Sequence, residues 1–147
     1  MRAVIAGSGI SIPDRVVTND DLTRFMDTDT DWIASRTGVL ERRVAEPGVS
    51  TADLGARAAT AALADADISP GEVDALIVAT MTPDYYAPCP APIVQDQVGL
   101  RTDIPAFCIR QQCSGFLYGL DMADALIRSG KAETVVVVGA EVHAGVQ

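Results

Sequence analysis

The chain has 147 residues, of which 48% are hydrophobic and 5% aromatic, and its formal net charge is −9. This length suffices for one domain with a packed core, and the apolar content excludes an intrinsically disordered chain. The negative charge repels phosphate backbones and anionic lipid headgroups, so we expect neither nucleic-acid nor membrane binding.

Five apolar runs predict strands, at Val4–Ile10, Val39–Val44, Asp74–Thr80, Ile104–Ile109 and Glu133–Gly139. Helices are expected between them, at Asp20–Met26, Trp32–Arg36, Ser50–Asp65, Ile93–Val98 and Ser114–Arg128, with a further turn at Ser69–Pro70. Strands that alternate with helices indicate an α/β fold with a largely parallel sheet covered on both faces.

Polar residues and glycines mark the expected helix ends. Asn19 is the predicted N-cap of the first helix, and Asp29, Thr30 or Asp31 that of the second. Ser50 is the predicted N-cap of the third helix, where it resembles a capping box with Asp53. Glycines are expected to end three helices, at Gly38, Gly99 and Gly130. The inner face of the Ala-rich third helix is predicted to consist of Leu54, Ala58, Ala61 and Ala62.

The three cysteines, Cys89, Cys108 and Cys113, form neither a metal-type CxxC pair nor an even set for disulfides. The apolar run at the N-terminus is too short for the hydrophobic region of an export signal. We therefore expect reduced thiols, a cytoplasmic protein and no metal site.

Cys113 lies between the predicted strand that ends at Ile109 and the predicted helix that begins at Ser114. Unpaired amides and the positive end of the helix dipole favour the thiolate there, which is the nucleophilic form. On the residues alone, the favoured interpretation of Cys113 is still a small buried hydrophobic side chain, and its position before a helix does not reverse that preference.

Gly115, Gly119 and Ala123 recur every four residues in the helix that follows Cys113. Such a stripe, almost without side chains, predicts a central helix that another helix or backbone approaches closely. We hypothesise a narrow enclosed channel at Cys113 that suits a long acyl substrate.

Several segments in chain order carry a family resemblance. They are Asp31-Trp32-Ile33, Ser35-Arg36-Thr37-Gly38-Val39, Glu41-Arg42-Arg43, Ala79-Thr80-Met81-Thr82-Pro83-Asp84-Tyr85, Cys113-Ser114-Gly115-Phe116-Leu117-Tyr118-Gly119-Leu120 and Val138-Gly139-Ala140-Glu141. Over residues 1–147 the chain resembles the N-terminal half of the 3-oxoacyl-acyl-carrier-protein synthase III family. The resemblance implies a thiolase-like fold, a layered α/β structure with a mostly parallel mixed sheet and a central helix, and a C-terminal half that is absent here.

The resemblance implies an acyltransferase in which Cys113 forms an acyl-Cys intermediate for a Claisen condensation in fatty-acid or polyketide biosynthesis. A malonyl thioester usually supplies the carbanion equivalent, and backbone amides at the helix start can hold the oxyanion. No cofactor is implied, because acyl-CoA or an acyl carrier protein delivers the substrate.

The same resemblance implies a coenzyme A site. Trp32 stacks on the adenine, Arg36 contacts the phosphates, and Thr28 and Thr37 lie nearby. The alternative is that Trp32 only packs its short helix and Arg36 is a solvated charge. The dense basic cluster of Arg36, Arg42 and Arg43 suits an acidic carrier protein or is a solvated face.

Other residues are given more modest roles. His143 is the only histidine, but the family's catalytic His and Asn come from its second half, so His143 is not expected to be the general base. Cys89 and Cys108 do not head a predicted helix and are expected to be structural. Asp84 and Tyr85 belong either to a loop near the substrate channel or to a simple turn.

Gln111 and Gln112 precede Cys113 where malonyl-decarboxylating synthases tend to have small residues. Relatives that condense two long acyl chains or transfer acyl groups are therefore an alternative. We expect a homodimer or pairing with a chain that supplies the C-terminal half. Competing hypotheses are a non-catalytic pairing subunit or fragment and, last, a thiol-based redox protein.

Overall fold

The computed structural model describes residues 2–143. The chain forms two compact units, a larger one of Met1–Ser11 and Ser50–Glu141 and a smaller one of Ile12–Val49 and Val142–Gln147. Each unit has its own sheet, and each is described by itself.

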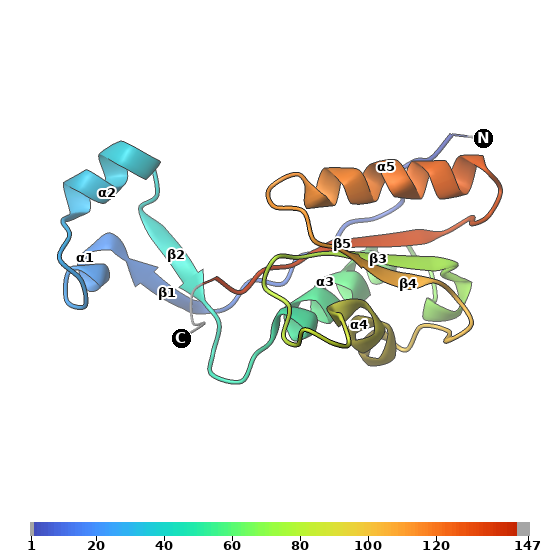
Figure 1. Cartoon of the computed structure of the whole chain (residues 1–147), viewed down its shortest axis with the longest axis horizontal. Coiled ribbons are helices and arrows are strands. Elements are labelled where there is room, and N and C mark those ends of the chain that lie inside the picture. The colour runs from blue at the N-terminus through green and yellow to red at the C-terminus, as the bar shows by residue number, and fades with distance from the viewer. Residues whose placement is uncertain (1, 144–147) are drawn as a thin grey trace. The chain divides into compact units, whose positions relative to one another are not determined.

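The larger unit is built on three parallel strands, β3 (Ala75–Ala79), β4 (Ala106–Ile109) and β5 (Val135–Gly139). Their order is β4-β3-β5, so the apolar run predicted to be central lies in the middle (Figure 1). Ile77 of β3 is opposite Phe107 of β4 and Val137 of β5. All five residues of β3 are buried, as expected for a strand covered on both faces.

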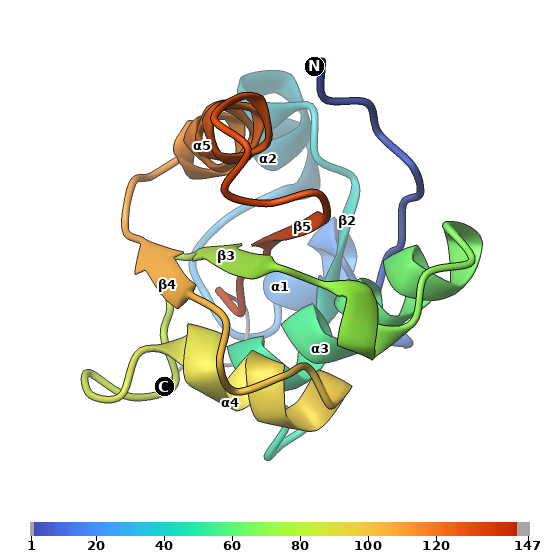
Figure 2. The ribbon, with the colours of Figure 1, turned by 90° about the vertical axis from the view of Figure 1, so that its right-hand side faces the viewer.

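Helices cover both faces of this sheet (Figure 2). The helices α3 (Thr51–Asp65) and α4 (Pro90–Val98) lie on one face, and α5 (Gly115–Arg128) lies on the other. A 3-10 turn, η1 (Pro70–Glu72), precedes β3 at the predicted Ser69–Pro70 turn. The predicted α/β fold with a parallel, doubly covered sheet is confirmed.

The inner face of α3 differs from the prediction. Its buried residues include Ala52, Ala56, Ala59 and Leu63, whereas Ala61 is exposed and Ala58 is half-buried. Leu54 is buried as expected. With so many alanines, small side chains point in every direction around the helix, and only contact with the sheet and α4 selects the buried stripe.

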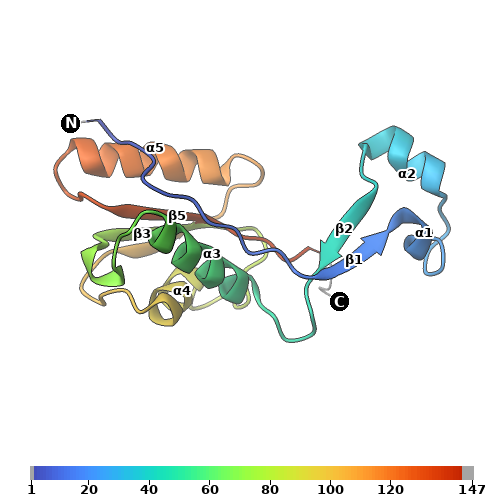
Figure 3. The ribbon, with the colours of Figure 1, turned by 180° about the vertical axis from the view of Figure 1, so that it is seen from behind.

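The segment Val4–Ile10 is not a strand, and this prediction is wrong. The segment runs beside α3 (Figure 3), where the Ser8 N–H donates to the Asp65 carboxylate at 2.8 Å. A Cβ atom built on Gly9 would lie 2.3 Å from the Ala58 carbonyl oxygen. The glycines therefore allow the chain to lie directly on a helix backbone, and no strand ladder of residues 2–143 includes it.

The smaller unit contains β1 (Arg15–Thr18), α1 (Asn19–Leu22), α2 (Thr30–Thr37) and β2 (Glu41–Val44). β1 and β2 pair antiparallel, from Arg15 opposite Val44 to Thr18 opposite Glu41. The sequence pattern does not predict β1, because only two of its four residues are apolar and its partner is distant in the chain.

Several predicted helix ends are confirmed and others are wrong. Asp29 caps α2, Gly38 ends it with φ 71°, and Ser50 with Asp53 forms the capping box of α3. The cap of α1 is Thr18, not Asn19, which is buried in the first turn. α4 begins at Pro90 and not at Ile93, since proline is well placed in the first turn of a helix.

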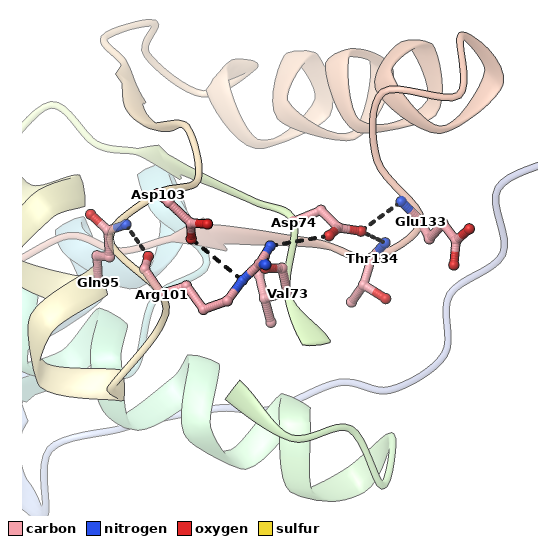
Figure 4. A network of polar contacts seen from close by, with 7 residues as sticks. All are labelled: Val73, Asp74, Gln95, Arg101, Asp103, Glu133 and Thr134. Carbon is pink, nitrogen blue, oxygen red and sulfur yellow. Dashed lines mark hydrogen bonds and ion pairs between the residues drawn. The ribbon is translucent and has the colours of Figure 1, made fainter. Parts of the chain in front are cut away.

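One carboxylate ties several parts of the larger unit together (Figure 4). Asp74, just before β3, accepts from the Glu133 N–H at 2.8 Å and the Thr134 N–H at 3.1 Å, just before β5. Arg101 lies between Asp74 and Asp103, at 3.4 Å and 3.6 Å. These contacts lower the pKa of Asp74. The hydrogen bond from the Glu133 N–H has the largest effect, that from the Thr134 N–H comes next, and the charge of Arg101 has a smaller effect.

Within residues 2–143, every helix is too short or too polar to cross a lipid bilayer.

Candidate active site

Cys113 lies in the turn that joins β4 to α5. The Gly115 N–H donates to the Gln112 carbonyl at 3.0 Å, which closes the turn around Cys113, and Ser114 is the N-cap of α5. Cys113 is exposed. The predicted place of this cysteine, after a strand and at the start of a helix, is confirmed, and its alternative as a buried hydrophobic side chain is wrong.

The turn of Cys113 lies at the carboxyl edge of the parallel sheet, where ligands of open α/β sheets usually bind. The segments that follow β3 and β5 meet at the same edge. There the Glu141 carboxylate accepts from the Met81 N–H at 2.7 Å, the Thr82 N–H at 3.0 Å and the Thr82 hydroxyl at 2.6 Å. Glu141 therefore fixes the loop after β3 to the end of β5.

Asp84 stabilises this edge through backbone contacts that its sequence position does not predict. Its carboxylate accepts from the backbone N–H groups of Thr51 at 2.6 Å and Ala52 at 2.9 Å. The Thr51 hydroxyl in turn donates to the Thr82 carbonyl at 2.6 Å. Asp84 thus caps the first turn of α3 from the loop after β3, while Tyr85 is exposed.

α5 contacts the sheet through the predicted stripe of small residues, since Gly115, Gly119 and Ala123 are its buried residues. A Cβ atom on Gly119 would lie 2.8 Å from Cγ1 of Val137 in β5. The first two turns of α5 also expose four large apolar side chains, Phe116, Leu117, Tyr118 and Met122. Residues 2–143 therefore do not by themselves enclose Cys113 in the channel that we hypothesised.

The residues predicted to bind coenzyme A lie in the smaller unit. Trp32 and Arg36 are one helical turn apart on α2, so they share a face of this helix. Trp32 is 56% exposed, and Arg36 is exposed with no ion pair to any described residue. A flat ring and a free guanidinium group are thus both presented to solvent on one surface.

Thr28 lies two residues before this helix, and Thr37 is its last residue. Thr28 is half-buried just before the cap Asp29, which accepts from the Trp32 N–H at 2.7 Å. The Thr37 hydroxyl donates to the Ile33 carbonyl at 2.7 Å and accepts from the Val39 N–H at 3.0 Å. Thr37 therefore closes the C-terminal turn of α2 inside this unit.

Two of the three arginines in the basic cluster form hydrogen bonds within the smaller unit. Arg42 donates to the side-chain oxygen of the buried Asn19 at 2.7 Å and to the Val17 carbonyl at 3.2 Å. Arg43 donates to the carbonyls of Pro13 at 3.2 Å and Asp14 at 3.4 Å. Arg36 is thus the member of the cluster whose guanidinium group makes no such backbone contact.

The prediction that neither Cys89 nor Cys108 heads a helix is wrong for Cys89. Cys89 is the N-cap residue of α4 and so does head a helix, because this helix begins earlier than predicted. Both side chains pack against the core of the larger unit. Burial and a hydrogen bond with the Cys89 thiol raise the pKa of the Cys108 thiol to about 12.

The predicted site residues belong to two different units. Trp32, Arg36, Thr28 and Thr37 lie on or next to α2 in the smaller unit, whereas Cys113 belongs to the larger unit. The anchoring role of Glu141 was not foreseen, although a carboxylate directly after an apolar strand is a signal for such a site.

Comparison with known proteins extends this description. The family described as thiolase, N-terminal domain, matches residues 33–145. The beta-ketoacyl-[acyl-carrier-protein] synthase III of Bordetella petrii is 50% identical over 95% of this chain. The chain spans 44% of that relative's length.

Solved structures show the same likeness. The 3-oxoacyl-[acyl-carrier-protein] synthase III of Aquifex aeolicus superposes with a TM-score of 0.88 at 44% identity, over 93% of this chain and 44% of that chain. The priming beta-ketosynthase of the R1128 polyketide pathway gives a TM-score of 0.88 at 32% identity, over 94% of this chain and 41% of that chain. The thiolase-like fold that the motifs implied is confirmed, and this chain belongs to the thiolase N-terminal domain family.

Proposed function

We propose that residues 1–147 form the acyl-accepting half of an acyltransferase of the 3-oxoacyl-acyl-carrier-protein synthase III type. The single observation that carries the proposal is the exposed Cys113 in the turn that opens α5, at the carboxyl edge of a parallel sheet. The 50% identity to a named synthase of this type supports it. Because the chain spans less than half of that relative, the activity of the whole protein is part of the proposal.

In the first step the Cys113 thiolate attacks the carbonyl carbon of an acyl thioester. A new carbon–sulfur bond forms, and the thiolate of coenzyme A or of a carrier protein leaves. Backbone N–H groups at the start of α5 are suitably placed to stabilise the oxyanion that develops on the carbonyl oxygen. The product is an acyl-Cys thioester, and no cofactor takes part.

In the second step a malonyl thioester loses carbon dioxide, and its carbanion equivalent attacks the acyl-Cys carbonyl. The Cys113 thiolate is the leaving group, and a 3-oxoacyl thioester is released for fatty-acid or polyketide biosynthesis. We propose that the His and Asn that assist this step belong to the part of the relatives' length that this sequence does not span. The free cysteines suit a reducing compartment such as the cytoplasm.

The exposed pair Trp32 and Arg36 is our proposed contact for the nucleotide end of coenzyme A. The indole ring stacks on the adenine and the guanidinium fork binds a phosphate, which are the geometries that these groups favour. Thr28 lies beside this surface, whereas the hydroxyl of Thr37 already has two backbone partners. An acidic carrier protein is a second proposed ligand of Arg36.

The proposal is tested by incubating the chain with acetyl-CoA and octanoyl-CoA and measuring its intact mass. We expect the mass of one acyl group to be added to the wild-type chain and none to Cys113→Ala. The matched control Cys108→Ala should still gain the acyl group. No adduct on a folded wild-type chain, or an adduct that persists on Cys113→Ala, would sink the proposal.

The nucleotide contact is tested with a substrate that lacks a nucleotide. In Arg36→Ala, we expect acylation by subsaturating acyl-CoA to slow by about tenfold, as for the loss of a charge-assisted contact of about 1.4 kcal/mol. Acylation by the N-acetylcysteamine thioester of the same acyl group should not change. Equal slowing with both donors would contradict a role for Arg36 at the nucleotide.

The exposed apolar residues in the first two turns of α5 favour a second candidate, a non-catalytic pairing subunit. Leu117, Tyr118 and Met122 present a surface suited to another chain, either a second copy or one that carries the C-terminal half. A chain that pairs but shows no adduct at Cys113 in the experiment above would favour this candidate.

A further inference from the structure

The start of α4 is short of backbone donors. Its first three residues are Pro90, Ala91 and Pro92, and because proline has no N–H, Ala91 alone among them can donate. The N-cap residue Cys89 does not accept this bond with its own side chain. The Ala91 N–H instead donates to Sγ of Cys108, across the unit on β4, at 3.2 Å.

This arrangement brings two sulfur atoms to one place. The side chain of an N-cap residue normally lies beside the second and third N–H groups of its helix. Here the sulfur of Cys108 takes that position, at the N–H of Ala91, two residues along the chain from Cys89. The nearby Cys89 thiol contributes to the raised pKa of the Cys108 thiol. Both side chains are half-buried against the core formed by α3, α4 and the sheet.

We propose that Cys89 and Cys108 are a modification site, a dithiol that a peroxide oxidises to a reversible disulfide within one chain. The site is separate from Cys113, which lies exposed in the turn before α5. Its formation requires that two thiols at the same end of α4 approach each other further. Cys89 ends an irregular segment, so a shift of its side chain breaks no bond of the β4–β3 ladder.

The chemistry balances in two steps. The sulfur of Cys89 attacks one oxygen of hydrogen peroxide, the O–O bond breaks, and a sulfenic acid and one water molecule form. The sulfur of Cys108 then attacks the sulfenic sulfur, the S–S bond forms, and a second water molecule leaves. The two thiols lose two protons and two electrons in total, and an added thiol such as dithiothreitol reverses the reaction by exchange.

The surroundings of the two thiols indicate the order of the steps. The high pKa of Cys108 leaves very little thiolate at neutral pH, so Cys108 is poorly suited to attack the peroxide itself. Of the two thiols, Cys89, at the end of the irregular segment before α4, is therefore the first nucleophile. Cys108 is therefore the resolving thiol, and its contact with Cys89 offsets its low reactivity.

Tryptic mapping tests the proposal, because the three cysteines fall on three different peptides. Cleavage after Arg57, Arg101, Arg110 and Arg128 places Cys89 in residues 58–101, Cys108 in residues 102–110 and Cys113 in residues 111–128. The reduced chain is treated with hydrogen peroxide, its remaining thiols are alkylated, and the digest is analysed without reduction. We expect peptide 58–101 linked to peptide 102–110 in most molecules, with peptide 111–128 unlinked.

Three cysteine variants and reduction with dithiothreitol show whether the link is the Cys89–Cys108 disulfide. The linked pair should persist in Cys113→Ser, disappear in Cys89→Ser and in Cys108→Ser, and be lost from the wild type after dithiothreitol. A link between peptides 102–110 and 111–128, a disulfide found only between two chains, or no linked peptide in a folded wild-type chain would each overturn the proposal. Far-UV circular dichroism establishes that each chain is folded before the oxidant is added.

Discussion

Asp84 stabilises α3 although it lies 33 residues after the helix begins. Its carboxylate accepts two of the N–H groups that every helix leaves unpaired in its first turn. The capping box of Ser50 and Asp53 satisfies others from within the local sequence. A helix start that is capped both locally and from a distant loop holds that loop in place at the carboxyl edge of the sheet.

We therefore predict that Asp84→Asn lowers the free energy of unfolding by about 1–2 kcal/mol, the usual cost of losing a helix cap. Asp121→Asn is the matched control, because it removes the same charge from an exposed position on α5 and should change stability by less than about 0.5 kcal/mol. Urea unfolding followed by circular dichroism measures both variants. Equal stability of the two variants would contradict the capping role.

Cys113 and Asp84 show what residue patterns convey at this scale. Cys113 was placed correctly because strand, turn and helix signals adjoin it in the sequence. Asp84 was interpreted only as part of a substrate loop or a turn, since the amides that it binds belong to residues far away in the chain. Local chemistry is visible in the sequence, whereas the identity of a distant hydrogen-bond partner is not.

At the scale of elements, the packing of α5 on β5 depends on the absence of a side chain at Gly119. A Cβ atom there would lie 2.8 Å from Cγ1 of Val137, and this β-branched side chain has few ways to move aside. The stripe of Gly115, Gly119 and Ala123 was visible in the sequence, but whether it would face a helix or a sheet was not. The structure shows that it faces β3 and β5.

We predict that Gly119→Ala destabilises the chain by about 1–2 kcal/mol, although alanine is the better helix former by about 1 kcal/mol. Overpacking against Val137 outweighs the gain in helix propensity. In Gly119→Ala with Val137→Ala, the cost should be smaller than the sum of the two single costs, because the second change makes room for the first. Additive costs in chemical unfolding would show that the two positions are not in contact.

At the scale of the whole molecule, Asp74 joins the starts of β3 and β5 and, through Arg101, the loop that precedes β4. Its lowered pKa arises mainly from the Glu133 and Thr134 N–H groups, with a contribution from Arg101. The ionised carboxylate is therefore more stable in the folded chain than in the unfolded chain. This part of the stability is present above the unfolded pKa and is lost as the pH falls through the folded pKa.

We predict that stability falls as the pH is lowered from about 5 to 2, and that Asp74→Asn removes part of this dependence. At pH 7 the variant should be less stable by about 1–2 kcal/mol, since it loses charge-assisted hydrogen bonds. Urea midpoints of both chains across this pH range measure the effect. A constant difference between the two midpoints at all pH values would show that Asp74 does not titrate with folding.

The predictions that failed share a cause at this scale. The apolar segment Val4–Ile10 has the composition of a strand, yet it lies along α3 because its glycines allow the close approach. The strand β1 was missed because its pairing with β2 joins residues more than twenty positions apart. Both results depend on which surface a segment meets, and short apolar runs do not encode that surface.

The sequence by itself determined the alternation of strands and helices, the cap Ser50, the glycine that ends α2 and the place of Cys113 before α5. It limited the cap of α2 to Asp29, Thr30 or Asp31. These features depend on residues within a few positions of one another, where periodicity and capping chemistry act. Only the tertiary structure decided that Asp84 caps α3, that Glu141 anchors the loop after β3, and that the sulfur of Cys108 serves the first N–H of α4. These contacts join residues 17 to 60 positions apart, and folding alone brings such groups within hydrogen-bonding distance.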